Sequence, residues 1–190
     1  RDCLDQRASA FEKLPSVGKK TARRYAYNVI DKMSLEDVEK FAQDLIETKK
    51  NIKHCEVCGM LTITSPCKVC TNTLRDKTKI MVVKDTNDVV AIEKIGEYNG
   101  LYHCLNGLIS PMDGIGPENL NIESLEKRIN DINELIIATP FTPQGETTAI
   151  FLEKILSNNQ LTISRLGYGL PAGGDIEYVD ELTLKRAIDN

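Results

Sequence analysis

Cys55-Glu56-Val57-Cys58-Gly59, followed after a short loop by Cys67-Lys68-Val69-Cys70, is the stretch that divides the chain into a helical front part and a mixed remainder. Eight residues, 59–66, separate the two C-x-x-C pairs, so four sulfurs can converge on one ion. A tetrahedral Zn²⁺ held by four thiolates at about 2.3 Å requires this arrangement. We therefore predict one structural Zn²⁺ per chain, with two disulfides, packed thiols or an iron site as alternatives.

One histidine and one glycine flank the first cysteine pair. Gly59 directly follows the first pair and permits the left-handed backbone that such a turn often needs. His54 precedes the cluster and offers a spare metal ligand, although a solvated histidine is the simpler interpretation. Cys3 and Cys104 lie outside the cluster and are expected to be free, buried thiols.

Composition places the chain among ordinary globular proteins. Its 190 residues are 27% charged and 41% hydrophobic, enough for one full domain and smaller modules. The sequence contains no apolar run of about 20 residues and no recognisable signal peptide. We therefore expect an intracellular, cytoplasmic protein.

Charge is distributed unevenly along the chain. The net charge is −4, but residues 1–54 hold 12 basic and 9 acidic side chains, against 12 and 19 in residues 55–190. The front part is therefore positive, and it is the segment in which an anionic partner is sought.

The front part reads as a helical hairpin. Leu4, Ala8 and Phe11 recur at helical spacing, which predicts a helix to about residue 13. The segment Leu14-Pro15-Ser16-Val17-Gly18 interrupts it, and Gly18 is expected to take a positive φ before a second helix begins.

The second helix has an apolar stripe, made of Ala22, Tyr25, Ala26 and Val29, and beside it a basic face. The basic face consists of two i,i+4 pairs of like charge: Lys19 with Arg23, and Lys20 with Arg24. Such pairs weaken an isolated helix, so an anionic partner is expected to compensate them. A phosphate oxygen can bind at the N-terminus of this helix, because the first backbone N–H groups there have no partner within the helix. A solvated basic face is the alternative.

A third helix begins at a capping signal. Ser34, with Asp37 three residues later, is typical of a capping box, and an apolar period follows it: Leu35, Val38, Phe41, Leu45 and Ile46. We interpret this helix as a packing element without chemistry.

After the cysteines, strands alternate with helices. We expect strands at residues 80–83, 101–105, 135–138 and 161–166, and helices near 87–96, 124–131, 146–156 and 181–188. This alternation predicts a parallel sheet covered on both faces, with sites beyond the carboxyl ends of its strands.

Two segments resemble known modules. Leu14-Pro15-Ser16-Val17-Gly18-Lys19-Lys20-Thr21-Ala22 resembles the helix-hairpin-helix DNA-binding motif, L-P-G-I-G-x-K-x-A, with Ser16 in place of its first glycine. The loops of the α/β part resemble the Toprim domain of topoisomerases and primases. Its catalytic members hold Mg²⁺ with a glutamate after the first strand, an Asp-x-Asp pair and a Glu-Gly-Glu.

This chain departs from the catalytic Toprim pattern. Lys84 stands at the first position, proline, threonine and glutamine stand at 140, 142 and 144, and only Gly145-Glu146 is retained. An ammonium group repels a divalent cation, and proline and threonine replace two charged ligands. We therefore predict no Mg²⁺ site, no strand cleavage and no nucleotidyl transfer.

The whole chain resembles the RecR family of bacterial recombination mediators. The order of modules carries the resemblance, as do the segments Gly107-Leu108-Ile109-Ser110-Pro111-Met112-Asp113-Gly114-Ile115-Gly116-Pro117 and Gly169-Leu170-Pro171-Ala172-Gly173-Gly174-Asp175-Ile176-Glu177-Tyr178. The resemblance implies an α+β, multi-module fold: helix-hairpin-helix region 1–53, four-cysteine zinc module 54–78, Toprim domain 79–166, and C-terminal extension 167–190 that contacts other copies.

The resemblance also implies a function. Such proteins are non-enzymatic and oligomeric, from dimers to tetrameric rings that encircle DNA near the bacterial nucleoid. They act with RecO, and in some settings RecF, to load RecA on single-stranded DNA. The residues expected to contact DNA are Lys20 and Arg24, with Lys19 and Arg23 as neighbours. Asp88, Glu146 and Arg165 are candidate contacts for RecO, with helix capping or stabilisation of the helix dipole as the alternative for the two acids.

Three functions compete at this point: a DNA-binding mediator, a metal-dependent Toprim nuclease or topoisomerase-like enzyme, and an adaptor that binds only proteins. The missing carboxylates oppose the second, and the basic helix opposes the third. We favour the mediator.

Overall fold

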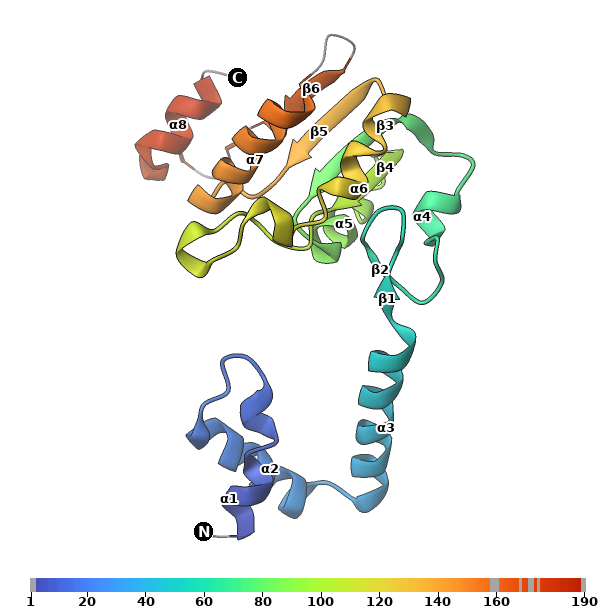
Figure 1. Cartoon of the computed structure of the whole chain (residues 1–190). Helices are drawn as coiled ribbons and strands as arrows, with labels where there is room; N and C mark the ends of the chain where they lie inside the picture. The colour runs from blue at the N-terminus through green and yellow to red at the C-terminus, as the bar shows by residue number, and fades with distance from the viewer. Residues whose placement is uncertain (1–2, 158–160, 168, 171–172, 174, 189–190) are drawn as a thin grey trace. The chain divides into compact units, whose positions relative to one another are not determined.

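The computed structural model (Figure 1) describes residues 3–157, 161–167, 169–170, 173 and 175–188. It divides into two compact units, Arg1–Ile52 and Lys53–Asn190. The finer four-part division stays a prediction, and residues 171, 172 and 174 of the second signature segment lie outside the described part.

Unit 1 is helical. It contains α1 (Cys3–Ala8), the 3₁₀ turn η1 (Phe11–Lys13), α2 (Lys19–Lys32) and α3 (Leu35–Asn51). Its small core joins Leu4 and Ala8 of α1 to Ala22 and Ala26 of α2, all buried. The predicted apolar stripe is thus confirmed at its two alanines, whereas Tyr25 is 39% exposed and Val29 half-buried. The prediction of one continuous first helix to residue 13 is wrong. The Ser9 hydroxyl donates to the Gln6 carbonyl at 2.7 Å and so competes with the helical pattern just where α1 ends.

The hairpin between η1 and α2 differs from expectation in one respect. Gly18 has φ −81°, so the predicted positive φ there is wrong, and Ser16 takes φ 63° instead. The Val17 N–H donates to the Leu14 carbonyl at 3.3 Å, closing a turn with Pro15 second and Ser16 third. A type II turn needs a positive φ at its third residue. Ser16 therefore stands where the left-handed backbone favours glycine.

Helix α3 begins as predicted but is not covered. Ser34 caps it, since its Oγ accepts from the Asp37 N–H at 3.1 Å. The apolar residues of α3 are not buried: Leu35 is 74% exposed and Phe41 48%. The interpretation of α3 as a packing element therefore does not hold within this single chain.

Unit 2 begins with the four-cysteine module. A short antiparallel pair, β1 (Lys53–His54) and β2 (Leu61–Thr62), flanks the first C-x-x-C, and α4 (Lys68–Thr71) starts directly after Cys67. Gly59 has φ 74°, as predicted. His54 is exposed, and its Nδ1 lies 2.9 Å from the Gly59 carbonyl.

The rest of unit 2 is a four-stranded parallel sheet in the order β4-β3-β5-β6. Its strands are β3 (Asp76–Val83), β4 (Gly100–Cys104), β5 (Glu134–Ala138) and β6 (Thr162–Arg165), and its helices α5 (Thr86–Glu93), α6 (Glu123–Glu126), α7 (Pro143–Leu156) and α8 (Glu181–Ile188). Short 3₁₀ turns lie at η2 (Pro111–Asp113), η3 (Pro117–Asn119), η4 (Ile129–Asp131) and η5 (Ile176–Tyr178). The predicted parallel α/β fold is confirmed.

Both faces of the sheet are covered, as Figure 1 shows for α7. One core joins Val82, Leu135 and Ile137 of the strands to Leu125 of α6 and Leu152 of α7. The other face carries Met81, Val83, Tyr102 and Cys104 with Val89 of α5, and Met60 and Val69 of the cysteine module pack against it. None of the described helices is long and apolar enough to cross a bilayer.

One predicted helix is shorter than expected. Residues 124–131 form α6, which ends at Glu126, and then the separate turn η4. The hydrogen bonds tighten there, because the Arg128 N–H donates to the Leu125 carbonyl at 2.9 Å. Such i→i+3 bonds set side chains three apart on the same side, so Leu125 and Arg128 can both reach the sheet.

Candidate metal centre and nucleic-acid interface

The four predicted sulfurs meet at one point. The Sγ atoms of Cys55, Cys58, Cys67 and Cys70 all lie within 4.8 Å of one another. Cys58 and Cys67 are 3.6 Å apart, and Cys55 and Cys70 are 4.0 Å apart. In a tetrahedron with metal–sulfur bonds near 2.3 Å, neighbouring sulfurs are about 3.8 Å apart. The cluster therefore has the ligand type and spacing of a four-thiolate metal centre.

The chemistry of the cluster also calls for a cation. The Cys70 thiol holds the pKa of Cys58 down to about 5, whereas burial raises the pKa of Cys67. Contact with Cys58, and then burial, raise the pKa of Cys70 well above its usual value. A thiolate thus forms readily at Cys58, and its charge opposes thiolates at Cys67 and Cys70. A divalent ion among the sulfurs removes that opposition.

The module is bonded to the sheet at the free edge of β4. The Cys104 N–H donates to the Cys58 carbonyl at 2.7 Å, and the Leu61 N–H donates to the Thr86 hydroxyl at 2.8 Å. The Asn106 amide donates to the Gly59 carbonyl at 3.1 Å. A Cβ at Gly59 would lie 2.7 Å from the Cys104 carbonyl. Close approach, as well as the positive φ, therefore requires glycine at 59.

The four predicted DNA-contacting residues are Lys19, Lys20, Arg23 and Arg24, and all are exposed on the first turns of α2. The N-cap is Gly18, which supplies no side-chain hydrogen bond, and the first turn of α2 contains no acidic residue. The N-terminal N–H groups and the positive end of the helix dipole therefore face solvent beside basic side chains.

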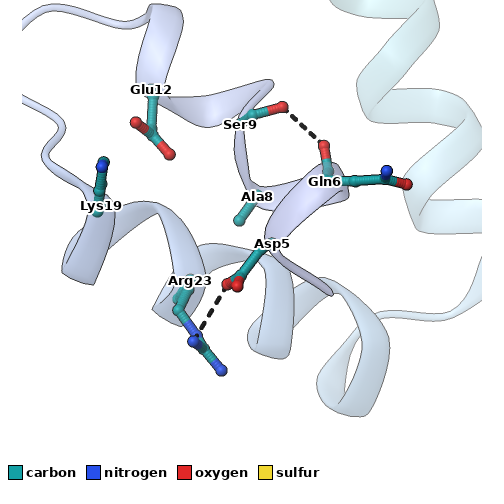
Figure 2. Close-up of a pocket in the computed structure, with 7 residues that line it drawn as sticks. All are labelled: Asp5, Gln6, Ala8, Ser9, Glu12, Lys19 and Arg23. Atoms are coloured by element: carbon teal, nitrogen blue, oxygen red, sulfur yellow. Dashed lines mark hydrogen bonds and ion pairs between the residues drawn. The ribbon is translucent and has the colours of Figure 1, made fainter. Parts of the chain in front are cut away.

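Two of the four cations line a pocket that also contains acidic residues, and one of them is ion-paired there, as Figure 2 shows. Lys19 and Arg23 line a pocket of about 500 Å³ together with α1 and η1 residues, among them Asp5 and Glu12. Arg23 Nη1 pairs with Asp5 Oδ1 at 3.1 Å. Asp5 therefore supplies part of the compensation within the chain, and compensation by an anionic partner stays a prediction.

The remaining predicted residues lie at the carboxyl edge of the sheet. Asp88 accepts from the Lys84 N–H at 3.0 Å and belongs to the capping box of α5 with Asp85, so the capping alternative holds for it. Glu146, in the first turn of α7, pairs with Arg165 of β6 at 3.3 Å, and that guanidinium lies 5.6 Å from the centre of the Phe141 ring. The structure thus brings Glu146 and Arg165 together.

The Toprim motif residues serve this edge structurally. Thr142 caps α7, since its hydroxyl accepts from the Gly145 N–H at 3.2 Å. A Cβ at Gly145 would collide with the Pro140 carbonyl oxygen. Lys84 Nζ pairs with Asp85 at 3.2 Å. Gly145 is therefore explained by packing, whatever chemistry the motif performs in other proteins.

These observations define a class: a protein whose chain carries a helix-hairpin-helix, then a four-cysteine module, then an α/β domain of the Toprim type. Comparison with family models agrees, matching the RecR helix-hairpin-helix at residues 5–49, the Toprim domain at 78–167 and the RecR C-terminal segment at 169–190.

Curated relatives identify the family within that class. Recombination protein RecR of Streptococcus mutans serotype c is 50% identical over 184 residues, 95% of this chain and 92% of the relative. The Streptococcus thermophilus protein of the same name is 50% identical over 183 residues, with the same two coverages. That of Lactobacillus delbrueckii subsp. bulgaricus is 48% identical, covering 94% of this chain and 91% of the relative. The chain belongs to the RecR family.

Sequence reasoning missed the residues behind these sites. Asp5 and Glu12 read as ordinary surface acids, because no local pattern places them beside α2. His103 of β4 and Arg128 are 25 positions apart in the sequence, and the Arg128 guanidinium lies 3.0 Å from His103 Nδ1 in the tertiary structure. A histidine within an apolar strand was the available signal for a buried, bonded ring.

Proposed function

We propose that this protein is a non-enzymatic, DNA-binding recombination mediator of DNA repair. In this role it acts in the cytoplasm with RecO, and in some settings RecF, to help load RecA on single-stranded DNA at gaps. The exposed basic face at the start of α2, on a helix-hairpin-helix, is the observation that supports the proposal most directly. The relatives named as recombination proteins support the wider role.

The basic face suits phosphates rather than bases. Phosphate contacts from Lys, Arg and helix N-termini fix a protein on DNA without reading its sequence. Four such contacts from one hairpin give a log–log salt dependence of only about −3.6 on duplex. Several hairpins in one assembly raise the effective concentration of binding groups, so assembly strengthens the grip on DNA.

A homo-oligomer, from a dimer to a tetrameric ring, is the second part of the proposal. Its support is the apolar stripe of α3, where Leu35, Phe41, Leu45 and Ile46 are 74%, 48%, 56% and 46% exposed. Contiguous exposed apolar residues of this size usually mark a protein interface. A second copy of the chain is the proposed cover.

The metal is proposed to be one structural Zn²⁺ per chain, held by Cys55, Cys58, Cys67 and Cys70. Four thiolates leave no open coordination position, so the ion stabilises the fold and supplies no catalytic step. Elemental analysis of the purified protein should give about one zinc per chain, and Cys67→Ser should unfold the module rather than change a reaction. Folded protein without zinc contradicts this assignment.

The DNA site is tested by a double variant with a matched control. Lys20→Ala/Arg24→Ala removes two exposed cations from α2, and Lys94→Ala/Lys154→Ala removes two exposed cations from unit 2. Affinity for single-stranded and duplex DNA is measured against salt, together with molar mass. The α2 variant should bind far more weakly, and its duplex slope should fall by about 1.8. Equal DNA affinities in the wild type and both double variants would exclude this DNA site and favour an adaptor that binds only proteins.

The absence of enzyme activity is tested on gapped DNA with Mg²⁺. Lys84 at the metal position, and proline and threonine in place of an Asp-x-Asp pair, support the expectation of intact substrate. Mg²⁺-dependent cleavage that co-purifies with the protein and depends on Glu146 would establish the nuclease alternative.

The RecO contact is proposed at the sheet edge that contains Asp88, Glu146 and Arg165. Because Asp88 caps α5, its removal would confuse binding with folding. The exchange Glu146→Arg/Arg165→Glu keeps an ion pair while reversing the charge on each side. It should abolish RecO binding with little change in stability, whereas unchanged RecO binding excludes this surface.

A further inference from the structure

The free edge of β4 holds the cysteine module and a guanidinium side by side. The Cys104 N–H donates to the Cys58 carbonyl at 2.7 Å, and the Tyr102 carbonyl accepts from Arg128 Nη1 at 2.9 Å. Residues two apart in a strand direct their backbone groups to the same edge, about 6.6 Å apart. Arg128 and the backbone of the metal-ligating Cys58 therefore bond to the same edge of β4, at residues two apart.

Arg128 is fixed there by a chain of hydrogen bonds. Its Nη1 also donates to His103 Nδ1 at 3.0 Å, and His103 Nε2–H donates to the Asn121 carbonyl at 2.6 Å. The Asn121 amide donates in turn to the Cys104 carbonyl at 3.0 Å. Burial lowers the pKa of His103 to about 4, so the ring stays neutral and its Nδ1 remains an acceptor.

One part of this charge is unmatched by hydrogen bonds. Arg128 Nη2 is buried and has no hydrogen-bond partner among the described residues. Burial lowers the pKa of Arg128, and the four cluster cysteines act against that change and raise it. A buried donor on a cation is costly unless negative charge lies nearby. The cluster sulfurs are groups whose negative charge acts on this guanidinium.

We propose that Arg128 is the countercharge of the four-cysteine metal centre, a positioning residue that retains the ion by offsetting the net charge of −2 on a divalent cation with four thiolates. The proposal rests on the metal assignment made above. The positive charge of Arg128 acts on the sulfurs through space. Arg128 also bonds to Tyr102 on the edge of β4 where Cys104 bonds to Cys58 of the module. Partners outside the ligand shell commonly change metal affinity by about 10- to 100-fold.

The test measures zinc retention in the full chain. Zinc-loaded wild type, Arg128→Gln, Arg128→Lys and Lys127→Gln are mixed with a chromogenic zinc chelator, and the release rate is followed at several salt concentrations. Lys127 is the matched control, a neighbouring exposed cation paired with Glu123 at 2.7 Å. Urea unfolding of each protein is measured in parallel.

Arg128→Gln should release zinc about 10-fold faster or more, Arg128→Lys should recover most of the retention, and Lys127→Gln should match wild type. Retention unchanged in Arg128→Gln overturns the proposal. So does equal loss in the Gln and Lys variants, which indicates packing rather than charge. If Arg128→Gln does not fold, Arg128→Lys decides: release within about 3-fold of wild type supports the countercharge, and faster release overturns it.

The parent assignment fails differently. Wild-type protein that folds without any zinc overturns the metal centre and this inference together. Zinc-loaded wild type with a silent Arg128→Gln overturns only the role of Arg128.

Discussion

The β4 edge and the basic hairpin differ in how their polar groups are satisfied. At the edge, Cys58, His103 and Asn121 are bonded into one buried network, and Gly59 has no room for a Cβ. On the hairpin, the cations are exposed and a Cβ at Gly18 would meet nothing within 4 Å. The first region is held together by hydrogen bonds within the chain, whereas the second leaves its cations available to a partner. Paired substitutions can test this contrast.

The largest expected effect is the difference in stability loss between substitutions at the two glycines, Gly59 and Gly18. Gly59→Ala adds a Cβ 2.7 Å from the Cys104 carbonyl at φ 74°, and should lower the free energy of unfolding by at least about 3 kcal/mol. Gly18→Ala, at φ −81°, should cost less than about 1 kcal/mol. Urea unfolding of both variants measures the difference, and similar losses would remove the contrast.

A pH effect sharpens the same comparison. His103 has its pKa lowered to about 4 by burial, against an ordinary value of 6.5, so between these values the unfolded chain binds a proton that the folded chain does not. Stability therefore falls as pH falls, by about 2 kcal/mol between pH 7 and pH 5 from this group. His103→Gln keeps a donor and an acceptor without titrating.

Urea unfolding of the wild type and His103→Gln at the two pH values checks this. The variant should lose less stability in acid, and acid release of the metal contributes equally to both proteins. Identical pH dependence would show that His103 does not titrate as its burial implies.

On the hairpin, removal of an internal partner should raise DNA affinity rather than lower stability. Asp5→Asn removes the partner of Arg23 while keeping its shape, so DNA affinity should rise about 3-fold, as expected for an exposed ion pair. Glu36→Gln removes the same charge from α3 and should leave affinity nearly unchanged. An equal rise in both would indicate net charge rather than competition for Arg23.

The smallest effect is expected at the turn. Ser16→Gly relieves a positive φ at the cost of greater freedom in the unfolded chain, and should stabilise unit 1 by about 0.5 kcal/mol. Ser16→Ala keeps the strain and should bring no gain. Hydrogen exchange of α2 amides measures the change, and a loss in Ser16→Gly would contradict the turn assignment.

Local sequence patterns predicted most of the fold. The C-x-x-C spacing predicted a cluster that forms, and apolar runs predicted strands within a residue of β4, β5 and β6, although β3 begins four residues before its apolar run. Motif spacing led to the wrong prediction that Gly18 has a positive φ. The residue that takes the positive φ is set by the turn type, and the turn is closed by the hydrogen bond from Val17 to Leu14, which the spacing does not reveal. The Arg23–Asp5 and Arg128–His103 contacts join separate elements, so no sequence period could reveal them.

The bare surface of α3 also bears on how the protein should be handled. A 17-residue helix without a buried side chain gains little stability from packing in its own chain, so its order is expected to depend on the proposed contact with a second copy. The melting temperature of unit 1 should then rise as the sample is concentrated, while the metal module melts at the same temperature in dilute and concentrated solution.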